Sequence, residues 1–542
     1  MTAAERPLVA LITAGAYISP DLAAEFGLIP PSFLPVGNRR LYQRQIEALR
    51  EAARFDRIVM SLPKGFQPSD FDIVALTSAG VELVYVPAST SLGESLTYVI
   101  LSAGLAHNRL RILHGDTLLL HYPFAEGDTF SAAQTRSFFG WADYTVQDGQ
   151  ARFPQGLPVA EASERMIATG AFAIDDTLDF LRCLALSDSC FITALDLYSV
   201  STPLAPLTAG EWRDFGHLQT YFQSRRLITT EREFNRLEVK GAFFSKSSKD
   251  GGKMAAELAW YQTLPKALRL FAPTVYPKTD CETPAGYEIE YLCLTTLSEM
   301  FVFGELPASV WRSVFEACNE FLTAAAAATP SGLTQAAPGI SHGDKTLARL
   351  EEYARHCGLD LDRPWKINGS TTPSLRSIVE ILSTRIGTTT EQDLTWIHGD
   401  FCFSNILFDF RTQRIKVIDP RGTDFLGRQT QFGDRRYETG KLHHSVVGLY
   451  DFIVAGMFRL DEATTYDVTL ALPHSNRLDA IKRIFLDLHY NGTTLSELKA
   501  LEISTLLFFA MLPLHRDCAQ RQRALLANGL RLWNIVEKNG AA

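Results

Sequence analysis

Short apolar runs alternate with amphipathic segments over residues 8–120 of the chain. Apolar residues recur at helical spacing in two of these segments, around Ile46 and around Val99. This alternation predicts a βαβ arrangement with a mostly parallel sheet, whose ligands bind at the carboxyl ends of the strands. The predicted strands, typical of buried strands because they are rich in β-branched residues, are 8–15, 57–63, 81–87 and 109–116.

The pattern changes further along the chain. Residues 121–230 are less regular, and 201–212 is typical of a loop. Beyond them the pattern predicts a hairpin at 237–248, a helix at 253–264, a strand at 286–294 and long helical stretches over 306–390 and 434–540. We therefore expect a domain boundary near residue 230, with an α/β domain before it and a second domain after it.

Composition and charge exclude several classes of function. The chain has 542 residues, of which 46% are apolar and 21% charged, as in ordinary globular proteins of two or three domains. Its net charge of -9, without a block of like charge, argues against a nucleic-acid partner. The eight cysteines form no C-x-x-C pair, so the sequence suggests neither a zinc site nor a redox motif.

The sequence also bears on location. The longest apolar run near the C-terminus, 506–514, is too short to span a bilayer. The first residues lack a basic segment and run directly into a strand-like pattern, so we expect no signal peptide. A cytoplasmic protein without membrane insertion is expected, and the oligomeric state is left open.

One segment carries a dense set of polar side chains between two apolar runs, "WIHGDFCFSNILFDFRTQRIKVIDPRG" from Trp396 to Gly422. Two strands joined by a polar turn would bring Asp419 back beside Asn405. Carboxylates and an amide are ligands that Mg²⁺ takes when it also holds nucleotide phosphates, and one of the two carboxylates, Asp400 or Asp419, must be left to accept a proton. The segment predicts a phosphoryl-transfer site. The alternative is a hydrogen-bonded turn beside a hairpin.

The spacing H-G-D-x-x-x-x-N, followed by a hairpin and I-D, resembles the aminoglycoside phosphotransferase and choline kinase family, a branch of the protein-kinase fold. The resemblance implies a bilobal α+β domain over 231–542, with a small lobe at about 231–300 and a helical lobe at about 301–542. It makes Asp400 the catalytic base and Asn405 and Asp419 the Mg²⁺ ligands. It makes His398 a residue that orders the loop.

The same resemblance implies a lysine paired with a helix glutamate beside the nucleotide. Lys246 and Glu257 fit this pair, and Lys240 is the rival lysine. Glu290 and Leu292 lie in the segment where the family has its hinge, whose backbone meets adenine. No G-x-G-x-x-G precedes Lys246, so the loop that would cover the phosphates is undefined.

Candidate substrate contacts follow the motif. Asp434 is expected to help bind the substrate, and Asp424 or Arg421 are further candidates, each with the alternative of a plain surface residue. The adjacent His443 and His444 on a helix are expected to be structural rather than metal-binding. The sequence leaves open whether the acceptor is a sugar, a polyol or an amino alcohol.

Three segments of the first half, 33–49, 112–116 and 211–221, resemble sugar-phosphate nucleotidyltransferases. The resemblance implies a Rossmann-like domain over 1–230 in which Asp116 and Asp214 hold a nucleotide-bound Mg²⁺. Such a metal offsets triphosphate charge while a substrate phosphate attacks and pyrophosphate leaves. Gly15 is what remains of the family's glycine-rich nucleotide-binding loop.

The first loop departs from the family pattern. The G-x-G-x-R core is missing, and Ser32 stands where the family has a lysine. Either this is a divergent active branch or the domain has lost catalysis. Residues 90–99 resemble the loop that meets the base or sugar, and Ser91 would equally suit an ordinary helix cap.

Together these patterns predict a bifunctional transferase that uses Mg²⁺ and small-molecule substrates. A kinase would phosphorylate a sugar or small alcohol with ATP, and a nucleotidyltransferase would activate the phosphate with CTP or UTP. Such fusions resemble enzymes that make precursors of capsule or other surface polysaccharides. The alternative is a kinase whose first domain binds a nucleotide or sugar phosphate without catalysis.

Overall fold

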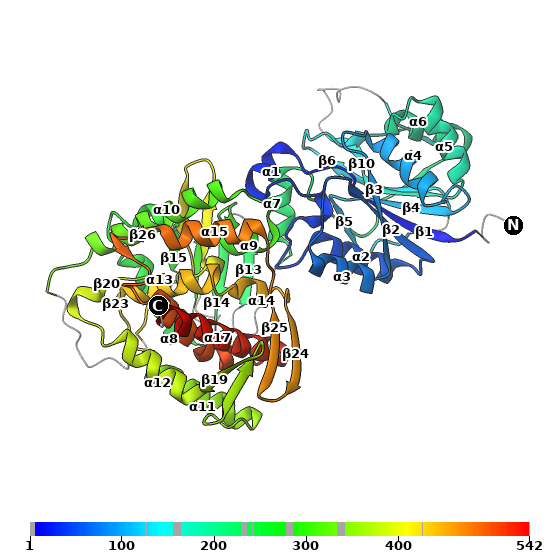
Figure 1. The fold of residues 1–542 in the computed structure, drawn as a ribbon. Coiled ribbons are helices and arrows are strands. Elements are labelled where there is room, and N and C mark those ends of the chain that lie inside the picture. Colours follow the sequence, from blue (N-terminus) through cyan, green and yellow to red (C-terminus); the bar gives the residue numbers. More distant parts are fainter. Residues whose placement is uncertain are drawn as a thin grey trace. The chain divides into compact units, whose positions relative to one another are not determined.

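A computed structural model describes residues 6–124, 127–154, 164–228, 236–240, 243–248, 250–277, 286–332, 342–424 and 426–540, without the side chains of 236–240, Pro277 and Gly540. The chain divides into two compact units (Figure 1). The first is Met1–Ile228 with Phe303–Glu305, and the second is Thr229–Val302 with Leu306–Ala542. Each unit has its own hydrophobic core.

The first unit is built on an eight-stranded mixed sheet whose centre is parallel. β1 pairs in parallel with β2 and β4, and β2 pairs in parallel with β3, which confirms the four predicted strands. The path through the sheet is β11-β6-β10-β4-β1-β2-β3, and β7 pairs with β10. The strands are β1 (Leu8–Thr13), β2 (Arg57–Pro63), β3 (Val81–Val86), β4 (Arg109–His114), β6 (Thr129–Thr135), β7 (Ala142–Asp143), β10 (Arg165–Ile174) and β11 (Ala205–Leu207).

Helices cover both faces of this sheet, as the ribbon in Figure 1 shows. α2 (Leu41–Ala52) and α3 (Asp70–Ser78) pack on one face through one hydrophobic cluster. A second cluster on the other face holds α4 (Leu92–Ser102), α5 (Thr177–Leu186) and α6 (Phe191–Ser201). This confirms an α/β fold with helices on both sides of a largely parallel sheet.

The strand order places a switch point between β1 and β4. From β1 the chain builds outward through β2 and β3, and β4 then returns to the other side of β1. Ligands of open α/β sheets bind at the carboxyl ends of strands at such a point. Gly15 follows β1 and Asp116 follows β4, so both predicted site residues lie at this edge.

The expectation of a loop at 201–212 is wrong. β11 lies inside it and β12 begins at Glu211. β11 was not predicted because an edge strand of three residues is too short to show alternation in the sequence. The remaining elements of the unit are α1 (Pro20–Phe26), the 3₁₀ helix η2 (Pro31–Phe33), β5 (Thr117–Leu120), β8 (Thr145–Gln147), β9 (Gln150–Arg152), β12 (Glu211–Asp214) and α7 (Leu218–Arg226).

The second unit begins with a four-stranded antiparallel sheet and one helix. The order is β13-β14-β16-β15, and the predicted hairpin, helix and strand are all present. The elements are β13 (Arg236–Lys240), β14 (Phe243–Ser247), α8 (Gly251–Gln262), η3 (Arg269–Phe271), β15 (Val275–Pro277), β16 (Gly286–Glu290), β17 (Thr295–Thr296) and α9 (Leu297–Phe303).

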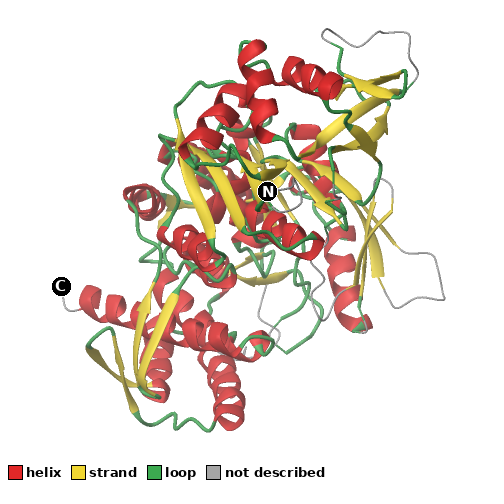
Figure 2. Cartoon of the chain, turned by 90° about the vertical axis from the view of Figure 1, so that its right-hand side faces the viewer, coloured by secondary structure: helices red, strands yellow, loops and turns green. Residues whose placement is uncertain are grey.

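The rest of the unit is mainly helical, and several of its helices pack around a large core. Its helices are α10 (Ala308–Ala327), α11 (His342–Cys357), α12 (Leu375–Ile386), α13 (Arg435–Val446), α14 (Tyr450–Val454), α15 (Asn476–Asp487), α16 (Ala500–Ala510) and α17 (Ala519–Gly540), with the 3₁₀ turns η4 (Glu391–Asp393), η5 (Phe403–Asn405) and η6 (Leu512–His515). α17 is the helix that runs to the C-terminus in Figure 2. Among the described residues, none of the helices is long and apolar enough to cross a membrane.

Strands also occur within the two stretches for which mainly helical patterns were expected. A sheet of order β19-β18-β25-β24 joins them. Asn368 and Gly369 connect β18 to β19 with φ angles of 49° and 79°, the left-handed turn that an Asn-Gly pair favours in hairpins. The strands of this sheet are β18 (Pro364–Ile367), β19 (Ser370–Ser374), β24 (Arg459–Thr464) and β25 (Asp467–Ala471). The other strands of this part of the chain are β20 (Leu394–Trp396), β21 (Ile406–Asp409), β22 (Arg414–Val417), β23 (Phe432–Asp434), β26 (His489–Tyr490) and β27 (Thr493–Thr494).

Candidate active sites

The hairpin β21–β22 brings together the polar residues of the Trp396–Gly422 segment. Ile406 pairs with Val417, and the Ile418 backbone N–H donates to the Asn405 carbonyl at 3.0 Å, so Ile418 lies opposite Asn405 and Asp419 is the next residue. Asn405 Nδ2 donates to both the backbone carbonyl and Oδ2 of Asp400, each at 2.9 Å. Asp400, Asn405 and Asp419 therefore gather at one end of this hairpin.

Lys246 links this hairpin to the antiparallel sheet. Its Nζ lies 2.7 Å from Glu257 Oε2 on α8 and 3.0 Å from Asp419 Oδ1. Burial lowers the pKa of Lys246, but the Asp419 and Glu257 carboxylates outweigh it and raise the pKa overall, so the side chain is cationic. The Tyr287 hydroxyl donates to Glu257 Oε2 at 2.8 Å and fixes that carboxylate. The side chain of the rival, Lys240, lies outside the described part of the structure.

His398 orders the loop that carries Asp400. Its Nε2 lies 2.9 Å from the Ile418 carbonyl, and its Nδ1 accepts the Asp400 backbone N–H at 3.3 Å. Burial lowers the pKa of His398 to about 4, so the ring is neutral and its Nε2 carries the proton. Glu438 holds the preceding turn, because it accepts the backbone N–H groups of His398 and Gly399 at 3.0 and 2.9 Å.

Lys441 on α13 forms an ion pair with Asp400. The Nζ to Oδ1 distance is 2.7 Å. Burial raises the pKa of Asp400, but the charges of Lys441 and Arg421 outweigh it and hold that pKa well below its usual range. The sequence reasoning missed Lys441 and Glu438 because no local spacing connects α13 to the loop. Their position beside Asp400 is decided by packing.

The two hinge candidates lie at the end of β16. The Glu290 backbone N–H donates to the Thr274 carbonyl at 2.9 Å, and its carboxylate accepts the Thr274 N–H at 3.1 Å. The Leu292 carbonyl accepts the Leu294 N–H at 2.8 Å. Their contact with adenine remains a prediction.

The three substrate candidates differ in their surroundings. Asp434 is buried, caps α13 and pairs with Arg436 Nη2 at 2.7 Å, so it has a structural task as well. Asp424 closes a local turn through the backbone N–H groups of Leu426 and Arg428 at 2.8 and 2.9 Å. Arg421 lies beside the loop that carries Asp400 and donates to the Tyr437 hydroxyl at 2.9 Å. All three remain predictions as substrate contacts.

Oxygen ligands at this site suit Mg²⁺. Asn405 offers an amide oxygen, and the Asp419 side chain is 43% exposed and uses one oxygen for Lys246. Mg²⁺ is usually held by one or two carboxylates together with substrate phosphates and water. Asn405 and Asp419 would hold the ion, and the ion would neutralise charge on the transferred phosphoryl group.

In the first unit, Asp116 and Asp214 meet at the carboxyl edge of the sheet. β12 pairs antiparallel with β5, which sets Asp214 opposite Thr117. A Cβ on Gly216 would lie 2.5 Å from Asp116 Oδ2 and 3.5 Å from Asp214 Oδ1, so the two carboxylates converge over this glycine. Burial and the charge of Asp214 raise the pKa of Asp116 to about 6. Two converging carboxylates fit a divalent cation, as the predicted Mg²⁺ site requires.

Residues that the sequence reasoning did not single out position these carboxylates. Asp214 Oδ2 accepts from Thr220 Oγ1 and lies 3.2 Å from His217 Nδ1. Gln45 Nε2 donates to the carbonyls of His114, Gly115 and Thr117, and thereby fixes the turn that carries Asp116. The segment 33–49 contains this glutamine, but only the fold shows that it reaches the end of β4.

The first loop is closely packed. A Cβ on Gly15 would lie 2.6 Å from Val86 Cγ2 and 2.9 Å from Ser95 Oγ, so only glycine lets α4 approach β1 here. Ser32 is fully buried, and its hydroxyl donates to the Gly115 carbonyl at 3.0 Å. Ser32 therefore supports the Asp116 turn in place of a lysine that would reach a phosphate.

Comparison with known proteins gives structural matches only. No protein-family model and no curated protein matches the sequence. The UTP-bound UGPase from Acinetobacter baumannii matches 40% of this chain and 92% of its own, with 13% identity and a TM-score of 0.33. HddC from Yersinia pseudotuberculosis matches 41% of this chain and 100% of its own, with 13% identity and a TM-score of 0.31. The chemistry of this chain is therefore inferred from its own residues.

Proposed function

We propose that the chain is a bifunctional transferase, whose second unit is a small-molecule kinase and whose first unit is a nucleotidyltransferase. The observation that supports the kinase assignment is a convergence of five side chains, namely Lys246, Glu257, Asp419, Asp400 and Asn405. A buried lysine paired to a helix glutamate and directed at a metal ligand is the arrangement that positions a nucleoside triphosphate in kinases.

In the kinase step, the acceptor hydroxyl would lie within reach of Asp400. Asp400 accepts its proton as the hydroxyl oxygen attacks the γ-phosphorus of ATP, and ADP leaves. Lys246 binds the ATP phosphates, and Lys441 keeps Asp400 ionised. His398 and Glu438 hold the loop in place, so the base is preorganised.

In the nucleotidyl step, the new phosphate would attack the α-phosphorus of CTP or UTP. Asp116 and Asp214 would hold the Mg²⁺ that offsets the triphosphate charge, and pyrophosphate leaves. The position of both carboxylates at the switch point of the sheet supports this assignment. The order of steps is chemically consistent, because the first unit consumes the phosphate that the second unit makes. A role in capsule or surface-polysaccharide synthesis is part of the same proposal.

The alternative proposal is a kinase with a non-catalytic, nucleotide-binding first unit. The observation that favours it is Ser32, which is buried and bonded to Gly115 where a phosphate-binding lysine is expected.

Mass spectrometry of products separates the two proposals. Wild type, Asp400→Asn and Asp116→Asn are each incubated with a small-molecule extract, Mg²⁺, ATP and a mixture of CTP, UTP and GTP. A nucleotide-linked product that is lost in both variants supports the bifunctional enzyme. A phosphorylated product that is lost only in Asp400→Asn supports the kinase with a binding unit. ATP-dependent transfer that is equal in Asp400→Asn and wild type refutes both.

A further inference from the structure

Four basic side chains from three segments act electrostatically on one another, and three of them act on the carboxylate of Asp400. Lys345 and Arg349 come from α11, Arg421 comes from the segment after β22, and Lys441 comes from α13. We call these four residues the basic cluster. We propose that the basic cluster binds an anionic acceptor, a hydroxyl compound that also carries a carboxylate or phosphate group. The inference rests on the proposed kinase function and names its substrate class.

Tyr437 is the point at which two members of the basic cluster meet. Arg421 Nη2 donates to the Tyr437 hydroxyl at 2.9 Å, and the guanidinium carbon lies 5.1 Å from the centre of the Tyr437 ring. Lys441 Nζ lies 5.9 Å from the same ring and 2.7 Å from Asp400. The ring of His342 stacks on Tyr437 with centroids 5.6 Å apart. These contacts set Arg421 and Lys441 side by side next to the catalytic carboxylate.

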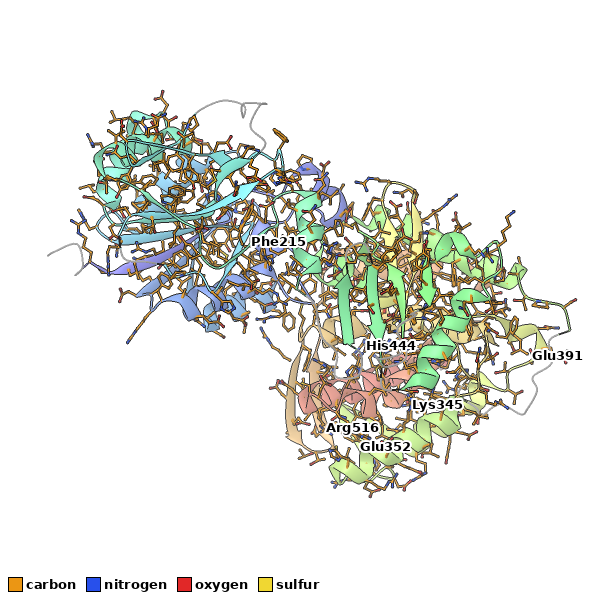
Figure 3. The ribbon with its side chains drawn as sticks, turned by 180° about the vertical axis from the view of Figure 1, so that it is seen from behind. Phe215, Lys345, Glu352, Glu391, His444 and Arg516 are labelled. Carbon is orange, nitrogen blue, oxygen red and sulfur yellow. The ribbon has the colours of Figure 1, made fainter. Side chains whose placement is uncertain are left out.

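α11 adds the other two members from one helical face. Lys345 and Arg349 are four residues apart and so lie one turn from each other on the same side. Arg349 Nη1 donates to the Ala510 carbonyl at 2.9 Å, which anchors this face against the end of α16. Figure 3 shows Lys345 on this helix, with Glu352 further along it and next to Arg516. Glu352 therefore has a cationic partner outside the basic cluster.

The positive charges act on one another. Burial, together with Arg421, Arg349 and Lys441, lowers the pKa of Lys345 to about 6, although Asp400 opposes the shift. Asp400 is one carboxylate and is already paired with Lys441. Glu438 accepts two backbone N–H groups, and burial raises its pKa to about 7. Burial also raises the pKa of Asp451, which interacts with Lys441. The potential around Asp400 is therefore positive, because the two arginines and Lys441 are charged. Lys345 is largely neutral at pH 7, and an anion bound beside it would favour its charged form.

An anionic substituent on the acceptor would be stabilised by this potential, and a cationic one would be repelled. Guanidinium groups such as those of Arg349 and Arg421 bind carboxylates and phosphates through paired N–H groups. Such binding would also place a hydroxyl of the acceptor beside Asp400. Among the acceptors that the sequence leaves open, the basic cluster thus disfavours amino alcohols and favours sugar acids or sugar phosphates.

Four acceptors with one ring and different charge test the proposal: glucose, glucosamine, glucuronate and glucose 6-phosphate. ATP-dependent transfer is followed by mass spectrometry and ADP release with the full-length protein and Mg²⁺. We expect kcat/KM for glucuronate or glucose 6-phosphate to exceed that for glucose at least tenfold and to fall as salt is added. The two anions separate carboxylate from phosphate recognition. Preference for glucose or glucosamine overturns the proposal and leaves the kinase intact.

Variants of the basic cluster give the second readout. Lys345→Met and Arg349→Met should each raise the KM for the anionic acceptor at least tenfold, with a smaller change in the KM for ATP. Arg355→Met is the matched control, because Arg355 is an exposed arginine on the same helix, and it should leave both constants unchanged. Equal effects of Arg349→Met and Arg355→Met would overturn the proposal.

Calorimetric titration with inorganic phosphate decides the case in which none of the four sugars is phosphorylated. Phosphate binding that is lost in Lys345→Met and Arg349→Met but kept in Arg355→Met supports the anion site. Absence of phosphate binding overturns it. The kinase assignment is judged separately, since its failure would appear as ATP consumption that Asp400→Asn leaves unchanged.

Discussion

Three buried histidines should make the second unit sensitive to acid. Burial lowers the pKa of His398 to about 4, that of His443 to about 3 and that of His444 well below its usual value. In an unfolded chain each titrates near a pKa of about 6.5. Between pH 7 and pH 5 the unfolded state therefore takes up protons that the folded state does not, and stability falls as pH falls.

The magnitude follows from the pKa difference. A histidine that titrates near 6.5 when unfolded and stays neutral when folded lowers the free energy of unfolding by about 2 kcal/mol between pH 7 and pH 5. Three such residues lower it by about 5 to 6 kcal/mol. Glu438 acts in the opposite sense, because burial raises its pKa to about 7 and its proton uptake by the folded state restores about 2 kcal/mol over the same range. The remaining loss is a large part of a domain stability of roughly 5–15 kcal/mol, so the second unit should be much less stable at pH 5 than at pH 7.

His444→Phe isolates one of the three contributions. The centroid of the His444 ring lies 4.4 Å from that of Tyr450 and 4.3 Å from that of Phe508. Among the described residues, neither nitrogen of the His444 ring has a hydrogen-bond partner. Phenylalanine can keep the ring contacts and cannot titrate. The loss of stability between pH 7 and pH 5 should therefore be about 2 kcal/mol smaller than in wild type. Any fixed effect of the larger ring cancels, because only the pH dependence is compared.

Urea unfolding at pH 5, 6 and 7 measures this dependence by tryptophan fluorescence. Five of the seven tryptophans lie in the second unit, namely Trp260, Trp311, Trp365, Trp396 and Trp533, so the signal reports mainly on it. His474→Asn is the control, because His474 has a 76% exposed side chain. An identical pH dependence in His444→Phe and wild type would refute the conclusion that His444 is neutral in the folded protein.

Three further predictions concern the proposed sites. Lys246→Met removes the cation nearest to the buried Glu257 and should destabilise the second unit by about 3–5 kcal/mol in urea unfolding, with partial recovery in Lys246→Met/Glu257→Met. Lys441→Met removes the ammonium that lowers the Asp400 pKa, so the acid limb of the kinase pH–rate profile should move to higher pH, whereas Lys441→Arg should move it less. Gly216→Ala places a methyl group against Asp116 and should reduce nucleotidyl transfer about 100-fold with phosphorylation unaffected; equal loss of both reactions would contradict separate sites.

Local patterns were sufficient where the structure depends on local contacts. The strands β1 to β4 and the helices between them follow from apolar spacing, because each element must bury one face. The geometry of Asp400, Asn405 and Asp419 follows in the same way, since a short hairpin returns the chain to its starting point. The Asn368-Gly369 hairpin was overlooked, although its sequence carries a strong turn signal.

Contacts between distant segments were decided by the tertiary structure. Lys441 reaches Asp400 from α13, and Gln45 reaches the end of β4 from α2. Neither pairing leaves a period or a spacing in the sequence, because it depends on how helices pack against loops far along the chain. The sequence by itself determined the candidate base, the candidate metal ligands and the candidate lysine–glutamate pair. Only the packing of α11 and α13 decided the charge around Asp400, since electrostatic potential depends on distances in space rather than along the chain.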